Sequence, residues 1–175
     1  DYTSKNLVSA MLDNPDITFW SWVDPYTYRN QLSLPKLMIN GTNDRYWVLD
    51  AMNLYWDGLI GEKYLLYVPN AGHGLDGGRD GALTTLAIFT QHVALGKSLP
   101  KLIWQHAMND GQWQLTVRST PVPKSVRLWS AHADTKDFRP AQWHATELSG
   151  LPDGTYVGHV PKPDSGHVAF YAEAA

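Results

Sequence analysis

The chain has 175 residues, of which 43% are hydrophobic and 18% charged, with a formal net charge of −3 and no cysteine. The hydrophobic content excludes an intrinsically disordered chain, and the small negative charge excludes the basic surface that nucleic acids require. No segment approaches the roughly 20 apolar residues of a membrane span. The absence of cysteine excludes disulfides, thiol catalysis and cysteine-ligated zinc. We therefore expect a globular protein with no nucleic-acid partner and no membrane span.

Strand-like and helix-like patterns alternate in residues 1–97. The patterns predict helices at 6–12, 48–57 and 80–95 and buried strands at 35–40 and 63–68. The order strand, loop, helix, strand, loop, helix is typical of a parallel sheet with crossover helices. We predict the fold class α/β, with residues 1–97 as the C-terminal part of an α/β-hydrolase domain.

Residues 98–175 alternate in hydrophobicity with a period of two. Asn109-Asp110-Gly111 is a typical hairpin turn between two of these strands. The pattern predicts six short strands, at 102–106, 113–117, 125–130, 142–147, 155–160 and 167–172. We therefore predict a small antiparallel β-sandwich of the immunoglobulin or fibronectin type over 98–175.

Asp44 and His73 are the candidate catalytic residues. Each follows a predicted parallel strand, and His73 lies between two glycines. Ligands of open parallel sheets bind beyond the carboxyl ends of the strands. A carboxylate there can orient an imidazole, and the imidazole can transfer a proton to and from a nucleophile. The alternative is a turn aspartate and a loop histidine with no joint role.

No residue of the chain has the sequence context of a serine nucleophile. The motif G-x-S-x-G does not occur, and Ser21 is the nearest candidate by position alone. We therefore expect the nucleophile to lie outside this chain, upstream in the intact protein, and the chain alone to be inactive. The histidines show no metal-binding spacing, so we expect no metal and no cofactor.

Three aromatic residues, Trp20, Trp22 and Tyr28, are candidates for the wall of a substrate cleft. Aromatic side chains combine a large apolar surface with a polar group, which suits substrate binding. Buried packing is an equally good explanation of the same residues.

Six short segments occur in an order that is typical of one protein family. They are VDPYTY (23–28), LPKL (34–37), NGTND (40–44), GEKYL (61–65), YVPNAGH (67–73) and TKDFRPAQW (135–143). Together they resemble the PhoPQ-activated pathogenicity-related family. The resemblance implies an α/β-hydrolase-like fold, a secreted or periplasmic location, and esterase or peptidase activity. It also matches Asp44 and His73 to the acid and the base of a catalytic triad.

The sequence thus supports two functional hypotheses. The first is the C-terminal part of a serine hydrolase that transfers acyl groups from a small-molecule ester or peptide substrate. The second is a non-catalytic extracellular protein that binds a peptide, glycan or receptor on the same scaffold. The oligomeric state stays open.

Overall fold

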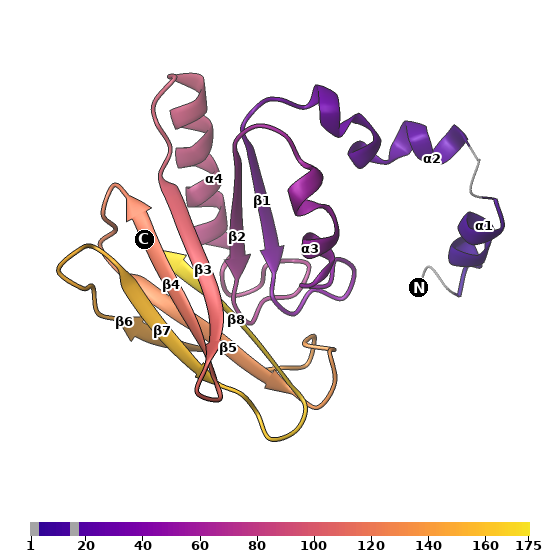
Figure 1. Cartoon of the computed structure of the whole chain (residues 1–175). Coiled ribbons are helices and arrows are strands. Elements are labelled where there is room, and N and C mark those ends of the chain that lie inside the picture. The colour runs from indigo at the N-terminus through magenta and orange to yellow at the C-terminus, as the bar shows by residue number, and fades with distance from the viewer. Residues whose placement is uncertain (1–3, 15–17) are drawn as a thin grey trace. The chain divides into compact units, whose positions relative to one another are not determined.

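The computed structural model describes residues 4–14 and 18–175 and divides them into short elements (Figure 1). In chain order these are α1 (Leu7–Asp13), α2 (Thr18–Val23), the 3₁₀ helix η1 (Pro25–Gln31), β1 (Lys36–Gly41), α3 (Ala51–Tyr55), the 3₁₀ helix η2 (Trp56–Gly58), β2 (Lys63–Val68), α4 (Arg79–Ala94), β3 (Lys101–Asn109), β4 (Gln112–Thr120), β5 (Val126–Ala133), β6 (His144–Leu148), β7 (Tyr156–Pro161) and β8 (His167–Ala174). The predicted strands and helices are confirmed, with bounds that shift by a few residues at most of their ends.

The chain divides into two compact units. One comprises Asp1–Lys36 with Asn53–Lys63, and the other comprises Leu37–Met52 with Tyr64–Ala175. In the first unit the Arg29 guanidinium group lies 4.3 Å from the ring centroid of Tyr26, a cation–π contact. The predicted domain boundary between residues 97 and 98 stays a prediction.

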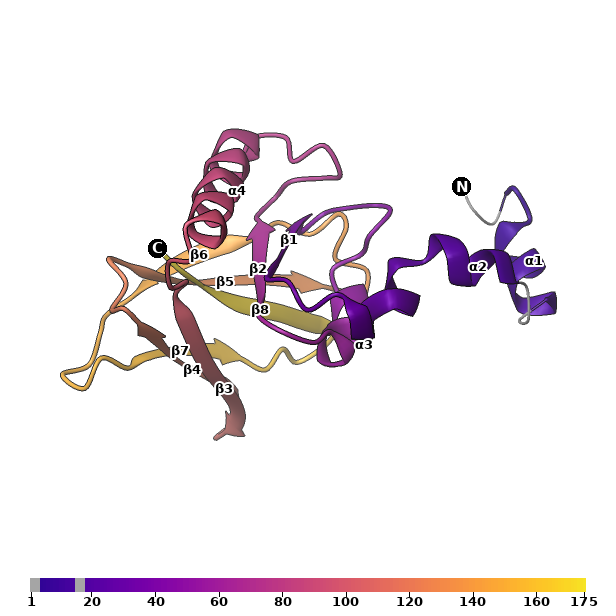
Figure 2. The ribbon, with the colours of Figure 1, turned by 90° about the horizontal axis from the view of Figure 1, so that it is seen from above.

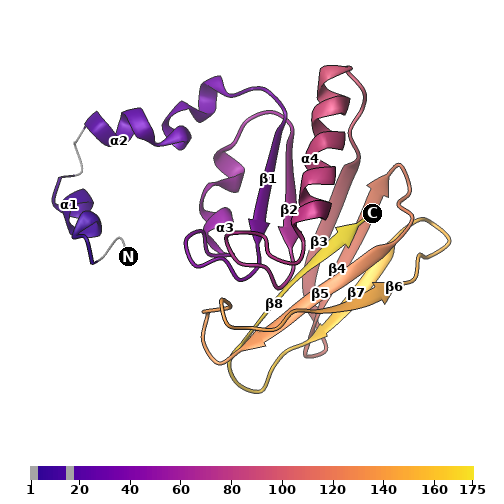
Figure 3. The same ribbon diagram turned by 180° about the vertical axis from the view of Figure 1, so that it is seen from behind.

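Strands β1 and β2 form a two-stranded sheet. The N–H of Lys36 donates to the carbonyl of Glu62, and the N–H of Thr42 donates to the carbonyl of Val68. Because both pairs have the same sequence offset, the two strands run in the same direction. Helix α4 lies alongside β2 in Figures 1 and 3, and its buried Ala82 packs against Val68.

The predicted α/β-hydrolase fold is wrong for the part of the chain that the structure describes. Only β1 and β2 form the expected parallel arrangement, whereas β3 to β8 form two antiparallel three-stranded sheets. The described chain is mostly β-strands in small sheets, with few helices. Two apolar runs predict two strands but carry no information about how many others join them. Leu83 and Leu86 of α4 are exposed, so this helix does not cover a wide sheet.

The six later strands have a sandwich-like arrangement. One sheet has the order β3-β4-β7 and the other β6-β5-β8. Figures 2 and 3 show the strands of both sheets. Their shared core consists of the buried side chains Leu115, Val117, Val126, Leu128, Tyr156 and Val160. Alternate residues of β4 point into this core, as the period-two pattern predicted. The turn of the β3–β4 hairpin has positive φ at Asp110 and Gly111, which explains these residue types there.

Helix α4, at 16 residues, is the longest helix described. Over residues 4–14 and 18–175, no helix combines the length and the apolar character needed to cross a lipid bilayer.

Candidate active site

Asp44 and His73 come together where β1 and β2 end. Asp44 follows β1 by three residues and His73 follows β2 by five. Because the strands are parallel neighbours, their carboxyl ends meet at one edge of the sheet. The His73 Nδ1 atom lies 3.0 Å from the Asp44 Oδ2 atom. The predicted contact between the two side chains is therefore confirmed.

Gly41 allows the two loops to approach this closely. A Cβ atom at this position would collide with the backbone carbonyl oxygens of Ala71 and Gly72. In the same place the N–H of Asn43 donates to the carbonyl of Ala71 at 2.9 Å. The loop after β1 therefore packs against the backbone of the loop after β2, and only glycine fits at the contact.

The Asp44 carboxylate is buried, with 3% of its side-chain surface exposed. Its Oδ1 atom accepts the N–H of Tyr46 at 2.7 Å and the N–H of Trp47 at 3.1 Å. Oδ1 therefore binds the backbone, whereas Oδ2 binds His73. Burial raises the pKa of this carboxyl, but the hydrogen bonds from His73, Tyr46 and Trp47 and the charge of His73 outweigh it. The net pKa lies below 3.8, and Asp44 is ionised at neutral pH.

The ionised carboxylate selects one tautomer of His73. A carboxylate can only accept hydrogen bonds, so the Nδ1 atom of His73 carries the proton that it donates. The Nε2 atom of the neutral imidazole is then the acceptor, as a general base requires. The side chain of His73 is 48% exposed, so a reacting group can reach it.

Two aromatic rings lie against His73. The centroid of the Trp47 ring is 4.6 Å from that of the imidazole in a stacked arrangement, and the centroid of the Tyr46 ring is 5.0 Å away, edge-on. Both residues are more than half exposed, at 58% and 56%. Neither ring was among the predicted site residues, although their positions two and three residues after Asp44 were a usable signal.

Asn43 and Asn70, which lie within three residues of Asp44 and His73, were also not among the predicted site residues. Both are in the segments that carry the family resemblance, and both bind the backbone of residues 138–143. Nothing in the local sequence indicates those partners, which are 73 to 98 residues away.

The three predicted cleft residues lie in the first unit, whereas Asp44 and His73 lie in the second. Trp22 in α2 and Tyr28 in η1 are exposed. Trp20 also lies in α2, but its side chain is outside the described part of the structure. The role of these residues in substrate binding stays a prediction.

Comparisons with known proteins place the chain in a family. The sequence profile of the PhoPQ-activated pathogenicity-related protein family matches residues 1–139. The chain is also 26% identical, over 196 aligned residues, to the autocrine proliferation repressor protein A of Dictyostelium discoideum. That alignment covers 99% of this chain and 40% of the Dictyostelium protein. No solved structure matches the chain. The profile match over most of its length shows that the chain belongs to the PhoPQ-activated pathogenicity-related protein family.

Proposed function

We propose that Asp44 and His73 are the acid and the base of a serine hydrolase that transfers acyl groups from ester or peptide substrates. One observation carries this proposal. A buried, ionised carboxylate accepts a hydrogen bond from Nδ1 of a half-exposed histidine, whose other ring nitrogen can therefore accept a proton.

The reaction follows from the two protonation states of His73. Nε2 accepts the hydroxyl proton as the serine oxygen attacks the substrate carbonyl, which forms a tetrahedral intermediate. The imidazolium then donates this proton to the leaving alcohol or amine, and the acyl group stays on the serine. A water molecule repeats the cycle, and its proton passes through Nε2 to the departing serine oxygen. Asp44 stabilises each imidazolium.

In this proposal the nucleophile belongs to the remainder of the whole protein. The 175 residues contain no G-x-S-x-G motif, and the chain covers 40% of the length of its Dictyostelium relative. This chemistry does not depend on the fold class. Aspartate, histidine and serine act together on several unrelated folds, so a catalytic pair is recognised by its geometry and not by the fold that carries it.

Tyr46 and Trp47 favour substrates with an apolar or aromatic group next to the scissile bond. Their exposed rings lie beside His73, where such a group would displace water from an aromatic surface. Trp20, Trp22 and Tyr28 stay candidates for a more distant part of the binding site. The family membership supports a secreted or periplasmic location.

A second candidate is a non-catalytic binding protein on the same scaffold. The Dictyostelium relative is named an autocrine proliferation repressor, a name that describes no catalytic activity. Under this alternative Asp44 and His73 would serve the structure alone.

A fluorophosphonate probe distinguishes the two functions. The whole protein is treated with the probe, and the labelled residue is identified by mass spectrometry. The hydrolase proposal predicts one labelled serine, with labelling that is lost in the His73→Ala variant and kept in His106→Ala, a change in the exposed strand β3. Absence of labelling in the folded wild-type protein would favour the binding protein.

A further inference from the structure

We propose that the β5–β6 loop, residues 134–143, is a positioning element for Asp44 and His73. It lies in the sandwich-like part of the chain, and it binds both loops that carry the pair. The inference rests on the proposed function for its kinetic test only, because the hydrogen bond between Asp44 and His73 can be measured without turnover.

Asn43 attaches the Asp44 loop to the β5–β6 loop. Its side-chain amide nitrogen donates to the carbonyl oxygens of Ala141 at 2.7 Å and Arg139 at 2.9 Å, and lies 3.5 Å from that of Phe138. Three backbone carbonyls therefore converge on one NH₂ group whose residue directly precedes Asp44. A side chain without donors at this position would leave these oxygens facing one another.

Asn70 attaches the His73 loop to the same segment. Its Oδ1 atom accepts the N–H of Trp143 at 2.7 Å, and its Nδ2 atom donates to the carbonyl of Trp143 at 3.0 Å. Its own N–H donates to the hydroxyl of Thr42, and this hydroxyl donates to the Oδ1 atom of Asn43. The two attachments are thus joined through Thr42 into one network.

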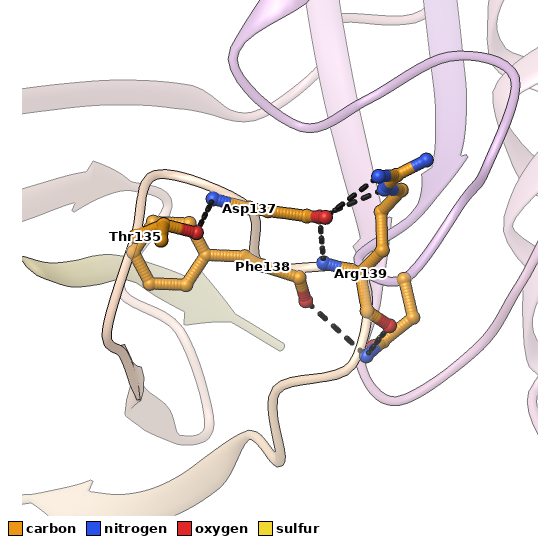
Figure 4. Close-up of polar contacts among 5 residues, drawn as sticks. Thr135, Asp137, Phe138 and Arg139 are labelled. Atoms are coloured by element: carbon orange, nitrogen blue, oxygen red, sulfur yellow. Dashed lines mark hydrogen bonds and ion pairs between the residues drawn. The ribbon is translucent and has the colours of Figure 1, made fainter.

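The β5–β6 loop is itself ordered by local contacts, which Figure 4 shows around Asp137. The two oxygens of Asp137 accept hydrogen bonds from the guanidinium group of Arg139 at 2.7 and 2.6 Å, and Oδ1 also accepts the N–H of Arg139. The hydroxyl of Thr135 accepts the N–H of Asp137. The hydrogen bonds from Arg139 lower the pKa of Asp137 to about 2, so this carboxylate is ionised at neutral pH.

The far end of the loop is held by aromatic packing. Trp143 is 2% exposed, and its ring contacts those of Phe138 and Tyr171, with centroids 6.3 and 5.4 Å away. Tyr171 belongs to β8, in the middle of its antiparallel pairing with β5. A loop fixed in this way transmits the rigidity of the sandwich-like part to the two loops of the site.

The test uses the whole protein labelled with ¹⁵N-histidine and compares three variants. Asn43→Asp replaces the converging donors by acceptors, Asn70→Gly removes both side-chain bonds to Trp143, and Asp137→Ala loosens the loop from its exposed side. We expect the Nδ1 proton of His73 to exchange with solvent about tenfold faster in the first two variants, as loss of a net hydrogen bond implies. We expect kcat to fall about 100-fold with little change in KM, because the base is misplaced.

The proposal is overturned if the Asn43→Asp and Asn70→Gly variants fold with a lower melting temperature but keep the wild-type proton exchange rate and the wild-type kcat. Such a result would show that the two asparagines have a structural role alone. If either variant does not fold, the Asp137→Ala variant replaces it in the test. A wild-type proton exchange rate and a wild-type kcat in Asp137→Ala would likewise overturn the proposal. Asn109→Asp, an identical change in the exposed β3–β4 hairpin, is the control and should leave both measurements unchanged. If the wild-type protein has no activity, the proposed hydrolase function fails. The positioning role of the β5–β6 loop is then still tested by the exchange rate of the His73 Nδ1 proton.

Discussion

Asn70 and Trp143 exchange two hydrogen bonds across 73 residues of sequence, with the Asn70 side chain pairing to the Trp143 backbone as a neighbouring strand would. Asn70 has a φ of 59°, in the left-handed region that asparagine tolerates better than most residues. This single side chain therefore both shapes the loop that leads to His73 and attaches it to the sandwich-like part.

Replacing Asn70 by glycine should lower the free energy of unfolding by about 1–3 kcal/mol. Glycine keeps the left-handed backbone but leaves the buried N–H of Trp143 without its acceptor. Urea unfolding measures the change. The control is Asn6→Gly, since Asn6 has a φ of 54° and its side chain makes no capping hydrogen bond. A similar loss of stability in both variants would show that the Trp143 bonds are not responsible.

Gly41→Ala should destabilise the protein by about 1–3 kcal/mol or more, because the new Cβ meets two rigid backbone carbonyls. Gly81→Ala is the matched control. Gly81 lies in α4, where a Cβ has open space, and alanine in a helix should stabilise by roughly 0.5–1 kcal/mol. Thermal unfolding compares the two. Unchanged stability of Gly41→Ala would mean that the two loops are not in close contact.

The hydrogen bond of Asp44 predicts a specific pH dependence of stability. Its pKa in the folded protein is lowered from 3.8, so the stabilisation is present above that value and is lost as the pH falls through the folded pKa. The difference in free energy of unfolding between wild type and Asp44→Asn should therefore shrink below about pH 4. Urea unfolding at pH 6, 4 and 3 measures this difference. A constant difference across the series would show that Asp44 gains nothing from its ionisation in the folded state.

Trp47→Ala should move the ring-proton resonances of His73, because the stacked indole ring contributes a ring-current shift to them. Stability should change by less than about 0.5 kcal/mol, since the side chain is more than half exposed. In the whole protein we expect KM to rise for esters with long or aromatic acyl groups and to change little for acetyl esters. Trp104→Ala, at a similarly exposed position in β3, is the control. An equal rise in KM for every ester would refute the proposed preference.

Much of the local structure could be predicted from the sequence. The apolar runs at β1 and β2, the alternation in β4 and the Asp110-Gly111 turn each depend on neighbouring residues, and these predictions were confirmed. The contact between Asp44 and His73 followed from two parallel strands that end at one edge. The predicted α/β-hydrolase fold was wrong, because the number of strands in a sheet depends on partners distant in sequence and two apolar runs do not reveal it.

The supporting residues of the site were not predictable for the same reason. The donors of Asn43 and Asn70 bind backbone carbonyls, which every residue has, so no side-chain pattern in residues 138–143 indicates the contact. The position of the loop depends on the burial of Trp143 against Phe138 and Tyr171. That packing is a property of the folded sandwich-like part.

The central claim is that His73, oriented by Asp44, is the general base of the whole protein. Its most direct test is the turnover of a p-nitrophenyl ester by the whole protein with and without the His73→Ala substitution. We predict a loss of kcat of at least about 10⁴-fold, as removal of a catalytic histidine causes in serine proteases. Turnover at the wild-type rate by a folded His73→Ala variant would contradict the claim.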